Sequence, residues 1–292
     1  SDVCSSDLVL AEDNINAVGL FTGPAGRAEL IDKIIESGRD VMTTKPFELD
    51  PEAGLAVLKK TKKLNRIVHL NSPSPILTED LKLIKDWQEK YDLGEPVGAS
   101  MSVYSKKNEK ADGTWYDNPE KCPAAPIFRL GIYAINDLLR ILGPAESVSV
   151  QSARISTGRP TPDNALLSVK FKNGAIGSIY ASFCIQDGDH YRNSLTVQFE
   201  RGTVYRNTGP IRNEKFGEAS LSLVKGSFSN GRKVVAEKIV SEISGYYQWT
   251  VFAAAIRDNL DKKTAAPETV TAGIRVIKAM AEAEAKQKIV NI

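Results

Sequence analysis

Three short apolar segments separated by two helical patterns constrain the fold of this chain most strongly. The segments at residues 17–22, 40–43 and 67–70 have the length and composition of buried strands. Between them, residues 25–38 place isoleucines and alanine on one helical stripe, and residues 51–65 begin with a proline suited to a first helical turn. Strands and helices that alternate with short connections predict a parallel sheet with crossover helices.

A different pattern follows Ser72-Pro73-Ser74-Pro75, where we place a domain boundary. Residues 167–172 alternate apolar and polar side chains, Asn173-Gly174 forms a turn and residues 176–182 return, which predicts a β-hairpin. Residues 195–202 extend this antiparallel sheet. The polar stretch 105–126 has no clear period, and we expect a loop there. We also predict helices at about residues 78–91, 127–142, 246–260 and 268–288, and a strand near residues 97–104.

The predicted fold class combines α/β and α+β architecture. A partial doubly wound, Rossmann-like parallel sheet in residues 9–75 precedes a larger α+β domain with an open antiparallel or mixed sheet in residues 76–292. Residues 1–8 lack a helix start and read like a translated sequencing adapter, so we expect a non-native artefact or a disordered polar terminus. No G-x-G-x-x-G motif occurs, and no strand is predicted before Ala17, so we expect the front half of the first sheet to be absent.

The charge balance and the rare residue types exclude several classes of function. Lys and Arg number 38 against 36 Asp and Glu, and this near-neutral balance argues against a nucleic acid or membrane surface as partner. No apolar run has the length of a membrane span, so we expect a cytoplasmic protein. Cys4, Cys122 and Cys184 form no CxxC pair, and His69 and His190 are the only histidines, so we predict neither disulfides nor a metal site.

Two polar motifs are candidates for chemistry. Lys45-Pro46 follows the second predicted strand, where a partly buried lysine could exchange protons, although most Lys-Pro pairs belong to ordinary surface loops. Arg129, Tyr133 and Asn136 recur at three- and four-residue spacing and would share one face of a helix. That face could line a cleft, or the tyrosine could simply pack at a domain interface.

In this order and spacing, four segments resemble the glucose–fructose oxidoreductase and inositol dehydrogenase (Gfo/Idh/MocA) family. They are the strand ending in Thr22-Gly23-Pro24, residues 36–46 with Thr44-Lys45-Pro46, Leu70-Asn71, and the helix 131–136 with Gly131-Ile132-Tyr133. The resemblance covers nearly all of residues 9–292. It implies an N-terminally truncated oxidoreductase that transfers a hydride between NAD or NADP and a sugar or polyol.

The resemblance also implies roles for individual residues. Tyr133 would be the acid/base at the substrate hydroxyl, and Lys45 would orient the substrate and lower the pKa of the tyrosine. These two groups should converge on one cleft between the domains, with Arg129 beside them. Asn136, Trp115 and Tyr116 would contact the carbohydrate. The expected cofactor-binding residues are Thr22, Gly23, Pro24, Arg27, Thr44, Lys45 and Asn71. A homo-oligomer through the C-terminal sheet is the expected assembly.

Three departures from the family pattern leave alternatives open. Thr44 replaces a glutamate, Arg27 stands where histidine is common, and Arg129 replaces an aspartate. A cation at position 129 would repel Lys45 or bind an anionic substrate. The chain would then be a non-catalytic sensor or scaffold that binds a sugar or cofactor. A third hypothesis is a structural partner that completes its sheet with another chain.

Overall fold

The structure is a computed structural model that describes residues 5–187, 191–209, 215, 217–241, 243–257 and 264–292. The chain forms two compact units. The first comprises Ser1–Ile76 and Gly245–Ile274, and the second comprises Leu77–Ser244 and Arg275–Ile292. The return of the chain to the first unit at residue 245 was not part of the sequence prediction. No helix among the described residues is long and apolar enough to span a membrane.

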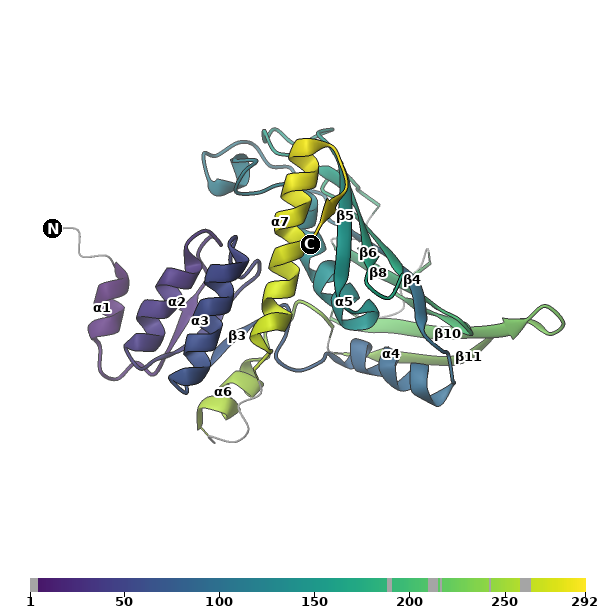
Figure 1. Cartoon of the computed structure of the whole chain (residues 1–292), viewed down its shortest axis with the longest axis horizontal. Coiled ribbons are helices and arrows are strands. Elements are labelled where there is room, and N and C mark those ends of the chain that lie inside the picture. The colour runs from purple at the N-terminus through teal and green to yellow at the C-terminus, as the bar shows by residue number, and fades with distance from the viewer. Residues whose placement is uncertain (1–4, 188–190, 210–214, 216, 242, 258–263) are drawn as a thin grey trace. The chain divides into compact units, whose positions relative to one another are not determined.

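The first unit is built on the predicted parallel sheet (Figure 1). Its strands are β1 (Ala17–Leu20), β2 (Asp40–Thr43) and β3 (Val68–Leu70), in that spatial order. Val18 pairs with Val41, and Val41 with Val68, so the three strands run in register and all carboxyl ends meet at one edge. Open parallel sheets bind ligands at this edge.

Helices α2 (Arg27–Glu36) and α3 (Pro51–Lys63) lie side by side in Figure 1 and share one core with the sheet. The apolar stripe predicted for α2 is buried, and Ile31 is fully inaccessible. Asp50 caps α3 by accepting a hydrogen bond from the Glu52 amide at 3.1 Å, and Pro51 occupies its first turn as expected. A second small core contains Met42, Ile67, Phe252 and Ala255, which brings α6 (Trp249–Arg257) against the sheet.

The structure corrects the prediction for the start of the chain. Residues 1–8 were expected to hold no helix, whereas α1 spans Ser5–Ala11. Leu10 explains this helix, because its side chain packs against the core of the first unit. Residues 1–4 lie outside the described part of the chain, as do Cys4, His190 and the predicted helix end at Leu260.

The second unit contains a mixed sheet of nine strands. The order is β11, β10, β9, β8, β4, β7, β6, β5, β12. Their bounds are β4 (Pro96–Tyr104), β5 (Ala145–Ala153), β6 (Asn164–Phe171), β7 (Ile176–Ser182), β8 (Arg192–Phe199), β9 (Gly202–Arg206), β10 (Ala219–Ser227), β11 (Gly231–Val240) and β12 (Val290–Asn291). Within the described residues of this sheet, β4 and β7 are the only neighbouring strands that run parallel. The sheet confirms the open, mixed architecture expected from the sequence.

The hairpin predicted at Asn173-Gly174 is confirmed by the antiparallel pairing of β6 and β7. Gly174 has φ of +88°, a left-handed conformation that glycine adopts without a Cβ clash. Figure 1 also shows β10 and β11 as a long hairpin that extends beyond the neighbouring strands. This hairpin was not predicted from the sequence.

The helices of the second unit are α4 (Glu79–Lys90), α5 (Ile132–Leu142) and the C-terminal part of α7 (Pro267–Lys286). The helix expected from residue 127 begins differently, because Ile127–Gly131 form a single π turn before α5. The expected loop at residues 105–126 also contains a short 3₁₀ helix at Trp115–Asp117.

Candidate functional site

Polar groups meet at the carboxyl ends of the three parallel strands in the first unit. Thr44 follows β2 and donates from Oγ1 to Oδ1 of Asn71, which follows β3, over 3.5 Å. Tyr247 donates its hydroxyl to Thr44 Oγ1 at 2.8 Å, and Asn71 donates from Nδ2 to the Gly245 carbonyl at 3.0 Å. A chain of hydrogen bonds thus joins two strand ends to the returning segment.

Arg27 connects the loops that follow β1 and β2. Its guanidinium donates to the carbonyl oxygen of Thr44 at 2.6 Å and to that of Phe47 at 3.3 Å. It also donates to the carbonyl oxygens of Thr22 and Pro46. The side chain is buried, and burial lowers the pKa of Arg27 to about 10 despite the opposing effect of nearby Glu48. Arg27 was predicted as a cofactor contact. Its hydrogen bonds fix the shape of the two loops.

The N-terminus of α2 is occupied by a carboxylate from the same unit. Glu48 is buried and accepts hydrogen bonds from the amides of Gly26 at 3.3 Å, Ala28 at 2.8 Å and Leu49 at 2.7 Å. The first amides of a helix often bind phosphate groups. Here they are satisfied by Glu48, so this helix end offers no place for an anion.

Lys45 lies in the loop after β2, between Thr44 and Pro46, whose carbonyl oxygens Arg27 binds. It follows Thr44 at the end of β2 and is half-buried, and Pro46 after it is buried. Of the neighbouring predicted residues, Thr22 is exposed, Gly23 is half-buried and Pro24 is buried. The structure therefore brings Thr22, Thr44, Asn71 and Arg27 together through hydrogen bonds, with Lys45 in the same loop as Thr44.

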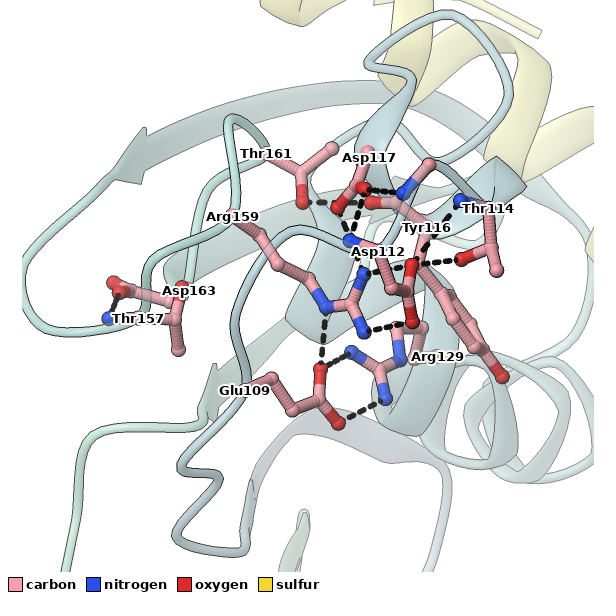
Figure 2. A network of polar contacts seen from close by, with 11 residues as sticks. Glu109, Asp112, Thr114, Tyr116, Asp117, Arg129, Thr157, Arg159, Thr161 and Asp163 are labelled. Atoms are coloured by element: carbon pink, nitrogen blue, oxygen red, sulfur yellow. Dashed lines mark hydrogen bonds and ion pairs between the residues drawn. The ribbon is translucent and has the colours of Figure 1, made fainter.

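A second polar cluster, which we call the loop network, organises residues 109–117 of the second unit (Figure 2). Arg159 is its centre, with 8% of its side chain exposed. Its guanidinium donates to Glu109 at 2.9 Å, to both oxygens of Asp112 at 2.9 Å, and to Asp117 at 2.7 Å. Arg129 completes the network with two hydrogen bonds to Glu109 at 2.7 and 2.8 Å.

The loop network holds its carboxylates in the ionised form. Hydrogen bonds from Arg129, and then from Arg159, lower the pKa of Glu109 to about 2 against the opposing effect of partial burial. Hydrogen bonding to Arg159 also lowers the pKa of Asp112. Burial raises the pKa of Asp117, and hydrogen bonds from Arg159 and from the amides of Asp112 and Gly113 outweigh it, so the net shift is downward.

This geometry revises the expectation for Arg129. A lone cation was expected to repel Lys45 or to bind an anionic substrate, but the bidentate ion pair with Glu109 balances its charge. Its guanidinium carbon also lies 4.1 Å from the ring centroid of Tyr116 and 4.6 Å from that of Phe183. No sequence pattern marks Glu109 as the partner of Arg129, because it lies twenty positions earlier in the chain.

The predicted aromatic contacts, Trp115 and Tyr116, belong to the same loop. Guanidinium groups of Arg129 and Arg159 lie 4.1 and 5.4 Å from the Tyr116 centroid, and the Trp115 ring lies 4.0 Å from it. Thr161 also donates its hydroxyl to the Tyr116 carbonyl at 2.9 Å. Both rings are half-buried and are engaged by groups of the protein itself.

Tyr133 and Asn136 lie on α5, where Tyr133 is half-buried and Asn136 is 3% exposed. The expectation that Arg129 shares their helical face assumed α-helical spacing. The π turn at Ile127–Gly131 breaks that spacing, because its hydrogen bonds span one residue more than those of an α-helix. The α-helical spacing therefore applies only between Tyr133 and Asn136.

Asp137, the next residue of α5, belongs to what we call the buried network, which the sequence analysis missed. Arg206 on β9 donates to Asp80, to Asp137 at 3.3 Å and to Asn193 at 2.7 Å. Ser244 donates its hydroxyl to the other oxygen of Asp137. Asp80, Asp137 and Arg206 are at most 2% exposed in their side chains.

The pKa of Asp137 moves in the direction opposite to the pKa values of the loop carboxylates. Burial raises it to about 6, Arg206 opposes this rise, and the second carboxylate at Asp80 adds to it. Nothing in the sequence pattern marks these residues, because they come from distant elements. Among the described residues, no group of three or more His, Cys, Asp or Glu side chains is placed to hold a metal ion.

Comparison with known proteins finds a matching sequence model and similar solved structures. A sequence model described as the GFO/IDH/MocA C-terminal domain matches residues 81–205. A putative NADPH-dependent oxidoreductase from Desulfitobacterium hafniense is similar in structure, with a TM-score of 0.78 and 15% identity over 98% of this chain and 82% of that one. A comparison with curated protein sequences finds no match.

Two further solved structures carry ligands. The WlbA dehydrogenase from Bordetella pertussis, in complex with NADH and UDP-GlcNAcA, has a TM-score of 0.71 and 17% identity over 99% of this chain and 83% of that one. An oxidoreductase from Agrobacterium radiobacter, in complex with NAD+, L-tartaric acid and magnesium, has a TM-score of 0.70 and 14% identity over 98% and 82%. Residues 81–205 therefore match the GFO/IDH/MocA C-terminal domain, in agreement with the predicted resemblance, and the chain has the fold of these oxidoreductases.

Proposed function

We propose that this chain is an NAD- or NADP-dependent oxidoreductase that acts on a sugar or polyol. The observation that carries the proposal is the hydrogen-bonded set Thr22, Thr44 and Asn71 at the carboxyl ends of β1–β3, in a chain with a GFO/IDH/MocA C-terminal domain. The complexes of similar solved structures with NADH, NAD+ and small polyhydroxylated molecules support it.

The strand-end residues fit the nicotinamide half of a dinucleotide better than its pyrophosphate. The residues proposed to hold the cofactor are Thr22, Gly23, Pro24, Thr44, Lys45 and Asn71, with Arg27 shaping their loops. Glu48 fills the N-terminus of α2, and the chain has no G-x-G-x-x-G motif. When bound, the nicotinamide supplies the acceptor or donor for a hydride.

In this proposal Tyr133 and Lys45 handle the proton. Tyr133 holds or accepts the proton of the substrate hydroxyl through its phenol oxygen. Lys45 orients the substrate through its ammonium group. Asn136 contributes hydrogen bonds to the substrate. Trp115 and Tyr116 belong to a preformed loop, which Arg129 holds through Glu109, and the shape of this loop limits the substrates that fit.

The test is turnover on a panel of sugars and polyols with NAD+ and NADP+. We expect measurable reduction of one cofactor by the wild type, and a loss of kcat of at least about a hundredfold in Lys45→Met and Tyr133→Phe. Lys62→Met on the last turn of α3 is the matched control, with no expected effect. Full activity in Lys45→Met and Tyr133→Phe would overturn the assignment.

The runner-up is a non-catalytic sensor or scaffold that binds a sugar or cofactor. The paired charge of Arg129, where the family pattern has an aspartate, favours this reading. A sensor binds NADH and a sugar without turnover, and its affinities do not change in Tyr133→Phe. Binding and turnover measured on the same sample therefore separate the two functions.

We also propose that the chain forms a homo-oligomer through the sheet of the second unit. One face of the sheet carries a cross-strand row of small hydroxyl side chains on neighbouring strands, whose members are half-buried or exposed. The row runs through Ser149, Ser168, Ser178, Ser100 and Thr196. Ser178→Arg would place a charge in its centre, and we expect the wild type to elute as an oligomer and the variant as a monomer in size-exclusion chromatography. A monomeric wild type would contradict the proposal.

A further inference from the structure

A row of three aromatic side chains lies at the carboxyl edge of the parallel sheet in the first unit. Phe21 follows β1, and its ring lies 5.6 Å from that of Tyr247 in an edge-to-face arrangement. Trp249 stacks on Tyr247, with 5.8 Å between the two ring centroids and 27° between the ring planes. We call Phe21, Tyr247 and Trp249 the aromatic row.

The row is held in place from within the unit, although its two ends are exposed. The hydroxyl of Tyr247 donates to Thr44, which lies among the strand-end residues. The ring centroid of Trp249 lies 6.3 Å from that of the buried Phe252, in an edge-to-face arrangement. The ring of Phe21 packs over Gly19 of β1, because a Cβ built at Gly19 would lie only 3.1 Å from it. The row is therefore a fixed surface and not a set of independent side chains.

The exposed fraction of the rings distinguishes the aromatic row from the pair Trp115 and Tyr116. Phe21 is 53% exposed and Trp249 is 50% exposed. Trp115 and Tyr116 are half-buried, and guanidinium groups lie against the Tyr116 ring. Exposing two large rings is costly in water, and an exposed flat aromatic surface binds flat rings by stacking. A ring-shaped ligand thus finds open faces at the row and not at Tyr116.

We propose that the aromatic row stacks against the nicotinamide ring of the cofactor and provides most of its affinity, an inference that rests on the proposed function. The row adjoins Thr44 and Asn71, which lie at the sheet edge where such folds bind ligands. Glu48 fills the N-terminus of α2, so the amides of that helix end are not open to a pyrophosphate. If the row provides most of the affinity, a mononucleotide that carries the nicotinamide ring binds nearly as tightly as the dinucleotide.

The experiment measures binding of NADH, nicotinamide mononucleotide and AMP to the full chain by quenching of tryptophan fluorescence. Trp87→Phe and Trp115→Phe together leave Trp249 as the reporter. We expect NADH and nicotinamide mononucleotide to quench Trp249 with affinities within about fivefold of each other, and AMP to bind at least tenfold more weakly. Fluorescence anisotropy of NADH serves as a second readout for variants that lack Trp249.

Two variants and one control locate the site. Phe21→Ser and Trp249→Ser should each weaken the binding of nicotinamide mononucleotide about tenfold, the range of a lost aromatic stack. Trp249→Tyr should retain most of the affinity, because it keeps a ring. Phe228→Ser, which removes an exposed ring from the β10–β11 hairpin, should change nothing.

Each other outcome overturns the inference in an identifiable way. If NADH binds and the serine variants bind it equally well, the row does not hold the ring, while the proposed function stands. If AMP binds as tightly as nicotinamide mononucleotide, the row does not select nicotinamide. If Phe21→Ser changes the elution volume and not the affinity, the row is a protein contact. If NADH does not bind the wild type at all, the proposed function fails as well.

Discussion

The loop network and the buried network contain the same kinds of groups and respond to pH in opposite directions. In the loop network two guanidinium groups face three carboxylates near solvent, and the pKa values of Glu109, Asp112 and Asp117 fall. In the buried network one guanidinium faces two carboxylates out of water, and the pKa of Asp137 rises to about 6. Desolvation, and not the presence of an arginine, therefore decides the sign of the shift.

The difference also separates two kinds of role. The loop network fixes an irregular segment that carries Trp115 and Tyr116, and Asp112 at its edge is 48% exposed. The buried network joins α4, α5, β8 and β9, and it ends at Ser244, the last residue of this segment of the second unit. Four predictions test this contrast, from the largest expected effect to the smallest.

Removal of Arg206 should have the largest effect. Arg206→Met leaves Asp80 and Asp137 buried without their cation, and breaking a buried ion pair by removing one partner costs about 3–5 kcal/mol. The free energy of unfolding from urea titration at pH 7 measures the loss. A change below about 1 kcal/mol would show that water reaches the two carboxylates and that this network is not buried in solution.

Asp137→Asn should stabilise the protein at neutral pH. The folded pKa of about 6 lies above the ordinary value of 3.8, so this group favours folding fully below pH 3.8, and that contribution is lost as the pH rises through about 6. The wild type should therefore lose about 2–3 kcal/mol between pH 4 and pH 7 from this group alone. Asparagine accepts the Ser244 hydrogen bond without a charge and removes this dependence.

The control for Asp137→Asn is Asp86→Asn, on the exposed side of α4. The thermal midpoints of the wild type, Asp137→Asn and Asp86→Asn would be measured from pH 4 to pH 8. The midpoint of Asp137→Asn should exceed the other two only at the higher pH values. Parallel curves for all three proteins would contradict the raised pKa of Asp137.

Arg159→Met should have a smaller effect on global stability, of about 1–2 kcal/mol, because its partners are close to solvent. The local effect should be larger, since residues 109–117 lose the centre of their hydrogen bonds. Limited proteolysis should cut the variant within residues 105–126 several times faster than the wild type. Equal cleavage rates would mean that the loop keeps its structure without Arg159.

Arg129→Gln should have the smallest effect, about 1 kcal/mol or less, because Arg159 still pairs with Glu109. The variant should also raise the pKa of Glu109 toward its ordinary value, since Arg129 is the largest cause of the downward shift. The folded pKa lies below the unfolded one, so the stability from Glu109 is present above pH 4.5 and lost as the pH falls through about 2. A double-mutant cycle with Glu109→Gln measures the coupling, and a coupling near zero would contradict the ion pair.

Local sequence patterns predicted the regular parts of this fold well. The apolar runs and helical stripes of residues 17–70 and the Asn173-Gly174 turn each specify their element through neighbours in sequence. The β10–β11 hairpin escaped prediction because nearly all of β11 is exposed, so no apolar alternation marks it. The π turn at Ile127–Gly131 escaped because its residues also suit an α-helix.

The candidate site was predictable only in part, for a physical reason. Motif order located Thr22, Thr44 and Asn71, which the sheet topology brings to one edge. The partners of Arg129 and Arg159 could not be predicted, because ion pairs between residues twenty to fifty positions apart leave no period in the sequence. The aromatic row was missed for the same reason, since Phe21 and Tyr247 lie far apart in the sequence.

The proposed function makes one claim that labelled substrates test most directly. The chain would be incubated with NAD+ or NADP+ and with sugars and polyols that carry deuterium on the oxidised carbon, and the cofactor would be analysed by mass spectrometry. The account predicts deuterium on the nicotinamide ring with the wild type and none with Tyr133→Phe. Tight binding of cofactor and sugar with no transfer of deuterium from any substrate would contradict the oxidoreductase and leave a binding protein.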